Sequence, residues 1–422
     1  MHGLSFGGIV LAAAVFALPA EAKVLYHWVE LGDGESATIR AITDGACPNA
    51  VFDGVTSPMA VRSEPATRFQ NVKPATFNVT GCEVAIPRGA KSASIESEPV
   101  NLPRPDPRRI VVFGDTGCRI AKGDRVQACN DPKSWPFPEV ARRAAATHPD
   151  LVIHVGDYLY REEACPAGNT GCAGTPYGFG WDTWDVDFFR PADPLLRSAP
   201  WIFVRGNHED CVRAAEGWFR FLDRAPMGQT CGDFSGIYVS QLGSFGIVNV
   251  DGARGDDKVK NAAEAAQSLR QQFMAIRDRI PLDAWLVSHR PFDAVRPGDK
   301  GTANVIDNRL QDGAISDLIP AGVRMLVAGH IHFFQAVDFG GKAPPQLVVG
   351  TGGDNLSPIP PMSVAGSQIN GKTVSAASAY SGFAYMVWDR SGAAGWTGTL
   401  FGFDGAAIDK CRLDGRSLQC NR

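Results

Sequence analysis

The sequence predicts a chain in two parts, a small all-β domain followed by a larger α/β domain. Residues 23–100 hold short segments of alternating apolar and polar side chains, separated by Gly, Pro, Asn and Asp, which is typical of strands joined by turns. After residue 109, apolar strand-like runs alternate with segments of helical spacing, which indicates a sheet covered by helices on both faces. Between these patterns, at 101–109, three alternating prolines favour a stiff, extended connector. We therefore expect a β domain over 23–106 and an α/β domain over 107–422.

The individual elements follow from short-range periodicity. Strands of the first domain are expected at 37–43, 60–63, 77–86 and 93–96. In the second domain, apolar runs that stop at a glycine or a polar residue predict strands at 109–113, 151–155, 201–204, 284–288 and 323–328. Helices are expected at 138–147 and 262–279, where apolar residues recur at helical spacing.

The first 22 residues are expected to be a signal peptide. An apolar run over 4–18 is followed by Pro19 and by the small-x-small sequence of residues 20–22, as in an h-region with its cleavage site. An N-terminal membrane anchor is the alternative, but this run is shorter than the ~20 residues that span a bilayer. We therefore expect a secreted or periplasmic protein without membrane attachment after cleavage.

The ten cysteines agree with export. Along the chain they form five neighbouring pairs, at positions 47 and 82, 118 and 129, 165 and 172, 211 and 231, and 411 and 420. Spacing alone leaves the connectivity open, but neighbour pairing would staple surface loops in an oxidising compartment. The charge is nearly balanced, with 41 basic against 45 acidic residues, so no basic surface for nucleic acid is expected.

Five of the predicted strands end in side chains that can bind a metal ion. The residues delivered in this way are Asp115, Asp157 with Tyr160, Asn207 with His208, His289, and His330 with His332. Loops at the strand ends of an α/β sheet converge on one crevice. Oxygen and imidazole donors suit iron, zinc or manganese. The set is too large for one tetrahedral ion, and it fits two ions that share a carboxylate.

These residues stand in five ordered blocks, which are Gly114-Asp115-Thr116-Gly117, Gly156-Asp157-Tyr158-Leu159-Tyr160, Gly206-Asn207-His208-Glu209, Leu286-Val287-Ser288-His289 and Gly329-His330-Ile331-His332. In order and in strand placement the blocks resemble those of the calcineurin-like metallophosphoesterases, and within them the purple acid phosphatase-like branch. The resemblance covers residues 109–355. It implies a four-layer sandwich, in which helices flank two stacked mixed sheets.

The resemblance also implies a ligand set. Asp115, Tyr160 and His332 would hold the first metal, and Asp157 would bridge the two metals. The second metal would bind Asn207, His289 and His330. Most members of the larger family have a histidine ligand at the place of Gly117, so Tyr160 is the expected replacement. A phenolate there would favour Fe(III), with Zn, Mn or Fe(II) at the second position.

The implied function is an exported phosphatase for small phosphomonoesters, in which metal-activated hydroxide attacks phosphorus. His208 would assist the leaving group and Glu209 could orient its ring. A phosphodiesterase with the same metals is the alternative, and a silent phosphate-binding protein is a third possibility. Three arginines beside the blocks are candidates for substrate phosphate, namely Arg161, Arg205 and Arg290. The sequence leaves the oligomeric state open.

Overall fold

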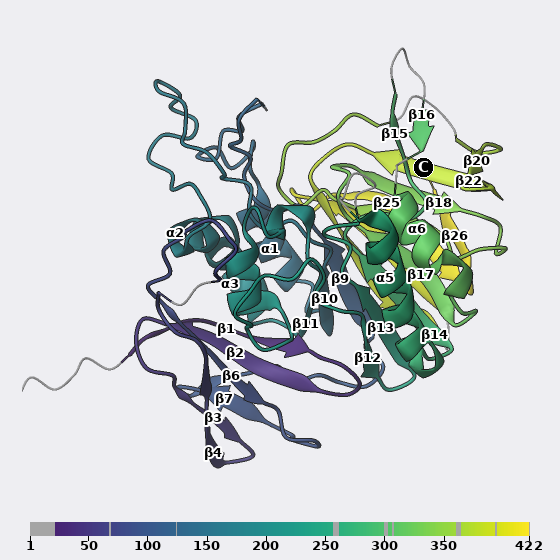
Figure 1. Ribbon diagram of the computed structural model, residues 1–422. Coiled ribbons are helices and arrows are strands. Elements are labelled where there is room, and N and C mark those ends of the chain that lie inside the picture. Colours follow the sequence, from purple (N-terminus) through teal and green to yellow (C-terminus); the bar gives the residue numbers. More distant parts are fainter. Residues whose placement is uncertain are drawn as a thin grey trace, which may run out of the picture.

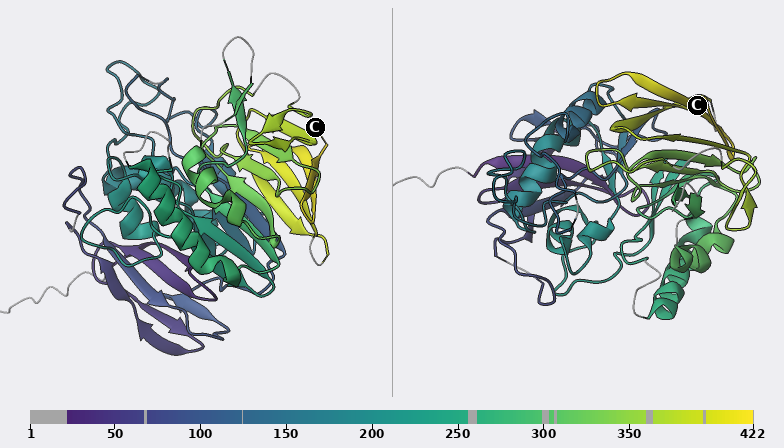
Figure 2. Two further views of the ribbon diagram at one scale, coloured as in Figure 1. Left: turned by 45° about the vertical axis from the view of Figure 1, so that its right-hand side comes forward. Right: turned by 90° about the horizontal axis from the view of Figure 1, so that it is seen from above.

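Two large mixed sheets, stacked face to face, form the centre of the structure (Figures 1 and 2). This computed structural model describes residues 22–66, 69–123, 125–255, 261–298, 303–305, 308–359, 364–392 and 395–421. Of the predicted signal peptide, only Ala22 lies within the described residues.

The first sheet has eleven strands, and four of them, in the order β9-β10-β11-β1, are parallel neighbours. Across the sheet the strands are β26 (Ser417–Cys420), β25 (Ala407–Asp414), β24 (Gly395–Gly402), β23 (Ala384–Arg390), β9 (Arg109–Phe113), β10 (Leu151–His154), β11 (Trp201–Phe203), β1 (Val24–Leu31), β2 (Ala37–Thr43), β6 (Thr80–Ala85) and β5 (Ala60–Ser63).

The second sheet has seven strands, of which β13, β14, β17 and β19 are parallel. Their order is β12 (Tyr238–Leu242), β13 (Phe245–Val250), β14 (Asp283–Ser288), β17 (Val323–Ala328), β19 (Gln346–Val349), β18 (Phe334–Asp338) and β22 (Ala376–Tyr380). Smaller sheets contain β4 (Val55–Pro58), β3 (Asn49–Phe52), β7 (Ala93–Ile95) and β8 (Glu98–Pro99), then β15 (Val295–Pro297) with β16 (Ala303–Val305), and β20 (Gln368–Ile369) with β21 (Lys372–Thr373).

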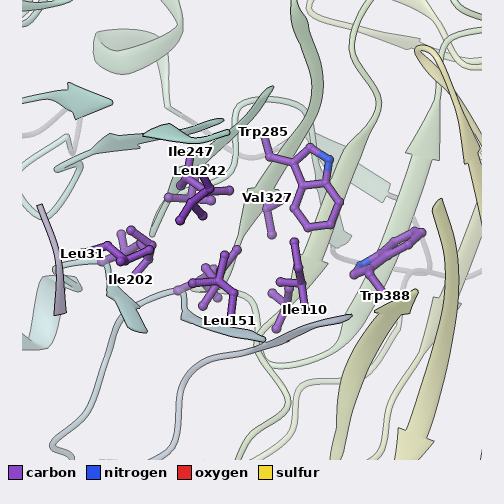
Figure 3. Close-up of a cluster of buried hydrophobic side chains, with 14 of the residues drawn as sticks. Leu31, Ile110, Leu151, Ile202, Leu242, Ile247, Trp285, Val327 and Trp388 are labelled. Carbon is purple, nitrogen blue, oxygen red and sulfur yellow. The ribbon is translucent and has the colours of Figure 1, made fainter. Parts of the chain in front are cut away.

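Alternation along the strands explains the layers. Side chains on a strand point to opposite faces in turn. Ile110 and Val112 of β9 therefore enter the core between the sheets, where they lie in one buried cluster with Trp285 of β14. Figure 3 shows Ile110 and Trp285 in this cluster. Their neighbours Val111 and Phe113 face outward into a second core under helices.

The helices lie on the two outer faces (Figure 2). They are α1 (Phe137–Ala145), α2 (Trp181–Trp184), α3 (Arg190–Leu196), α4 (Ala215–Gly217), α5 (Ala262–Ile276) and α6 (Arg309–Ile315). On α5 the buried residues Leu269, Phe273 and Ile276 form one stripe, which packs on the outward face of the second sheet. The α/β class and the four-layer sandwich are confirmed.

The predicted strands and helices are observed, with shifts at their ends. The helix expected over 262–279 ends at Ile276 and continues as a 3₁₀ turn, Arg277–Arg279. Sequence patterning missed β1, because this strand carries the polar residues His27 and Glu30, both of which are buried. Glu30 pairs with Arg40 of β2 at 3.1 Å.

The described N-terminal residues up to 106 form strands and loops. Strand β1 pairs with β11 in parallel, so these strands extend the first sheet. The proline-rich connector is fastened at Asp106, whose amide donates to the carbonyl of Leu242 at 2.9 Å. The domain boundaries of the sequence analysis stay a prediction. In the described part of the chain, no helix has the length and apolar character needed to cross a membrane.

All ten cysteines form disulfides between sequence neighbours. The bonds are Cys47–Cys82, Cys118–Cys129, Cys165–Cys172, Cys211–Cys231 and Cys411–Cys420. Their Cα–Cα distances lie between 4.0 and 5.7 Å. The thiols are therefore not available as metal ligands.

Candidate metal centre

The candidate site is built at the carboxyl ends of five parallel strands. In the first sheet β9, β10 and β11 are neighbours, and in the second sheet β14 and β17 are neighbours. Asp115 follows β9, Asp157 follows β10 and Asn207 follows β11. His289 directly follows β14, and His330 comes two residues after β17. Residues that are far apart in the sequence therefore meet at one edge of the sandwich.

Asp157 lies at the centre of this group. Its Oδ2 atom is 2.7 Å from the hydroxyl oxygen of Tyr160 and 3.1 Å from Nε2 of His289. The Asp157 side chain is almost completely buried. A single carboxylate oxygen thus touches donor groups on both of its sides.

Two clusters of donors flank Asp157. On one side the Tyr160 hydroxyl lies 3.1 Å from Oδ1 of Asp115 and 3.2 Å from Nε2 of His332. On the other side Nε2 of His289 lies 3.1 Å from Oδ1 of Asn207. The ligand atoms of Asp157, His289 and His330 all lie within 4.8 Å of one another. All seven predicted ligands are therefore brought together, in two groups around one shared carboxylate.

The backbone brings the ligands close by unusual conformations. Asp115, Asp157 and His330 have φ values of 56°, 60° and 70°, in the left-handed region that non-glycine residues rarely adopt and that occurs at functional sites. At Gly206 a Cβ atom would lie 2.0 Å from Oδ1 of Asp157, so only glycine fits there.

The imidazoles are oriented by their second ring nitrogens. Nδ1 of His289 donates to the carbonyl of Val155 at 2.8 Å. Nδ1 of His332 donates to the carbonyl of Asn355 at 2.9 Å. In each ring Nε2 therefore faces the cluster of candidate ligands and is the nitrogen that could bind a metal ion, as is usual for histidine ligands.

The site brings together buried carboxylates, a phenol and imidazoles, whose charge and lone pairs a cation would satisfy. Burial raises the pKa of the Tyr160 hydroxyl well above its ordinary value, and the carboxylates of Asp157 and Asp115 raise it further. Although burial opposes it, the imidazoles of His289 and His208 hold the pKa of Asp157 well below its ordinary range. Buried carboxylates, a phenol and imidazole nitrogens at mutual distances near 3 Å fit hard or borderline metal ions.

His208 lies beside these donors, and its ring packs on that of Tyr160 with a centroid distance of 4.1 Å. Nδ1 of His208 is 2.6 Å from Oε1 of Glu162. Its backbone N–H donates to Oδ1 of Asp157 at 2.9 Å. The ring is therefore held from two sides, and Glu162 rather than Glu209 contacts its nitrogen.

Glu209 is fully buried and holds the loop that carries Asp157. One carboxylate oxygen accepts from the amides of Tyr158 and Leu159 at 2.9 and 3.3 Å. The other accepts from the amides of Asp157 and Gly206, both at 3.2 Å. Burial and the nearby charge of Asp157 raise the pKa of Glu209.

Sequence reasoning missed Glu162 and also Asp354. Asp354 is completely buried, and its Oδ2 atom lies 3.2 Å from Nδ1 of His332. Arg119 binds this carboxylate and lies over the Tyr160 ring, at 4.4 Å from its centroid. The glycine-rich run 350–353 before Asp354 was the available signal. It lies against the first block, where the Gly352 amide donates to the Gly114 carbonyl at 2.9 Å.

The three candidate arginines differ in their surroundings. Arg161 is buried against Asp187 and lies over the Trp135 ring. Arg205 donates to the carbonyls of Glu209 and Gly232 at 2.8 and 2.9 Å.

Arg290 reaches the donor group itself, because its Nη1 atom lies 3.0 Å from Nε2 of His330. A phosphate contact by any of the three arginines stays a prediction.

Two other patterns do not form sites of this kind. Residues 366–373, GSQINGKT, match the pattern of a phosphate-binding loop, which requires a strand before and a helix after it. Here they include the β20–β21 hairpin and lead into β22, and Lys372 pairs with Asp293 at 2.6 Å. Asp409, Cys411 and Cys420 also cluster, but both sulfur atoms are used in a disulfide.

Comparison with known proteins identifies a family and a fold. The family model of the calcineurin-like phosphoesterases matches residues 108–334. The purple acid phosphatase PPD1 from yellow lupin (Lupinus luteus) seeds is similar at a TM-score of 0.54 and 14% identity, over 92% of this chain and 73% of that chain. A PhoD structure is similar at 0.50 and 12% identity, over 94% and 91%. At these identities the likeness is one of fold. No curated protein sequence matches the chain.

Proposed function

Since the chain belongs to the calcineurin-like phosphoesterase family, and is therefore a metal-dependent phosphoester hydrolase, we propose that it hydrolyses small phosphomonoesters at a two-metal centre. The observation that carries this proposal is the position of Asp157, whose Oδ2 atom lies within 3.1 Å of donors on both sides. One metal would be held by Asp115, Tyr160 and His332, the other by Asn207, His289 and His330, with Asp157 shared. Cations held there supply Lewis acidity, lowering the pKa of a water molecule and neutralising phosphoryl charge.

The chain's own residues would hold the ligands in position and protonate the leaving oxygen. Glu162 engages Nδ1 of His208 at 2.6 Å, which leaves Nε2 as the nitrogen that can face a substrate. From there His208 would donate a proton to the leaving oxygen. Glu209 would act as a positioning residue, because it accepts from three N–H groups of the Asp157 loop and from the N–H of Gly206.

The preference for monoesters is a proposal that the fold likeness to a purple acid phosphatase supports. It is tested by stripping the purified protein of metal, reloading it with iron and zinc or with manganese, and assaying matched mono- and diesters. We expect the stripped protein to be inactive and the reloaded protein to bind about two ions per chain and to favour monoesters. A preference for diesters would select the phosphodiesterase alternative, and activity without metal would contradict the mechanism.

We propose Fe(III) at the position that includes Tyr160, because its oxygen lies beside two carboxylates and, once deprotonated, would be a hard, anionic donor. The iron-loaded, oxidised protein is expected to show a visible phenolate-to-iron absorption band. Tyr160→Phe is expected to abolish the band. The separate control variant Tyr177→Phe changes an exposed tyrosine and is expected to leave the band unchanged. A band that survives Tyr160→Phe would remove Tyr160 from the ligand set.

Export to the periplasm or the medium is also proposed. Five disulfides in one chain support an oxidising compartment.

A further inference from the structure

Two arginines at the same edge of the sandwich are not held by close hydrogen bonds. Nη1 of Arg213 lies 3.6 Å from Oε1 of Glu162. Nη2 of Arg213 and Nη1 of Arg254 both lie 3.6 Å from one oxygen of Asp210. These distances exceed those of charge-assisted hydrogen bonds. By contrast, Arg119 binds the carboxylate of Asp354 at 3.0 Å, and Arg205 binds the carbonyl of Glu209 at 2.8 Å.

Both arginines lie at the metal centre's edge of the molecule. Arg213 follows the Asn207 block, and the next residue donates its amide to the carbonyl of His208 at 3.0 Å. Arg254 follows the carboxyl end of β13, the strand beside β14, at whose end His289 lies. Although burial opposes it, Asp210 and then Asp157 raise the pKa of Arg213, so its charge lies within the field of the shared carboxylate.

Glu162 connects this pair to the reaction. Its Oε1 atom touches Nδ1 of His208 and also faces Arg213. Since His208 would protonate the leaving oxygen, Arg213 lies on the leaving-group side. The two guanidinium groups face each other across a single Asp210 oxygen, and their side chains are 26% and 30% exposed. The carboxylates around these two like charges, from Asp210, Glu162 and Asp233, lie 3.4–3.6 Å from the guanidinium nitrogens. None of them makes a close hydrogen bond, so the partly exposed pair is open to an added anion.

We propose that Arg213 and Arg254 bind an anionic group on the leaving-group portion of the substrate. The substrate class would be phosphomonoesters that carry a carboxylate or a second phosphate a few bonds from the scissile ester. The inference rests on the proposed function and adds that the substrate carries a second negatively charged group. Arginine suits this task because its planar fork binds carboxylate and phosphate oxygens in pairs.

The test uses phosphonates, because their P–C bond is not cleaved and binding is measured apart from catalysis. Calorimetry on the metal-loaded protein would compare 3-phosphonopropionate and propane-1,3-bisphosphonate with 3-hydroxypropylphosphonate, which has the same phosphonate but an uncharged hydroxyl at its far end. We expect the two ligands with a second anionic group to bind about ten- to hundredfold more tightly than 3-hydroxypropylphosphonate, the range expected of a charged hydrogen-bonded contact. Comparison of 3-phosphonopropionate with propane-1,3-bisphosphonate shows whether the second anionic group is preferred as a carboxylate or as a phosphate-like group.

Arg254→Gln is expected to reduce the affinity ratio toward one, and it leaves Glu162 untouched. Arg213→Gln is the second variant. Arg270→Gln, an exposed arginine paired with Asp317 on the outer helical layer, is the matched control and is expected to keep the ratio. Equal affinities in the wild-type protein, or a ratio that neither variant changes, would overturn the inference. Failure of the proposed function would appear separately, as missing hydrolysis of monoesters by the same metal-loaded protein.

Discussion

Asp157→Asn is expected to lower kcat/KM by about 10³-fold or more and to lower the bound metal from about two ions per chain to one or none. The reason is that Oδ2 of Asp157 lies 2.7 Å from the Tyr160 hydroxyl and 3.1 Å from Nε2 of His289, so both positions depend on one oxygen. Two cations contribute several kcal/mol to transition-state stabilisation, and each ~1.4 kcal/mol is a factor of ten in rate. Elemental analysis and steady-state kinetics on the same sample would measure both effects.

The matched control for this variant is Asp317→Asn. The substitution is the same, but Asp317 is 60% exposed and pairs with Arg270 on the outer helical layer. We expect the control to keep its metal and its activity, because exposed ion pairs contribute little. If Asp157→Asn kept two ions and activity within tenfold of the wild type, the shared-carboxylate arrangement would be wrong.

The donor residues of the site could be predicted because each follows a recognisable strand. The run before Asp157 is apolar except for His154, and the run before His289 is apolar over residues 284–287. Parallel strands deliver their ends to one edge, so local pattern and topology together predict the group. Glu162 and Asp354 could not be predicted in this way. They contact imidazole nitrogens only because loops fold back, and no fixed spacing marks such partners.

The fold, like the site, could be predicted from the sequence only in part. The four-layer sandwich was expected from the family resemblance. Apolar runs predicted β9, β10, β11, β14 and β17, but they did not predict other strands of the two large sheets, such as β13 and β23. The pairing of β1 with β11 left no local signal, since it joins residues such as Glu30 and Trp201 that are far apart in sequence. β1 also buries polar side chains, so its pattern did not stand out.

Arg62→Met is expected to destabilise the whole protein by about 3–5 kcal/mol, the usual effect of removing one partner of a buried charge network. Arg62 lies on β5, and its side chain is 1% exposed. It donates to the carbonyls of Phe219, Arg220, Asp223 and Ala225 at 2.6–2.9 Å and to Glu83 at 2.9 Å. Burial lowers its pKa to about 10, yet it stays charged at neutral pH.

The way in which Arg62→Met melts would also test how the N-terminal strands relate to the rest of the chain. Arg62 lies among these strands, whereas its carbonyl acceptors lie in the segment before Cys231, and β1 continues the same sheet through β11. We therefore expect calorimetry to show one cooperative transition, shifted to lower temperature. Arg412→Met removes an arginine that is 70% exposed and paired with Asp414, and it should change stability by no more than about 0.5 kcal/mol. A separate early transition in Arg62→Met, with the main one unchanged, would mean that the N-terminal strands unfold as an independent domain.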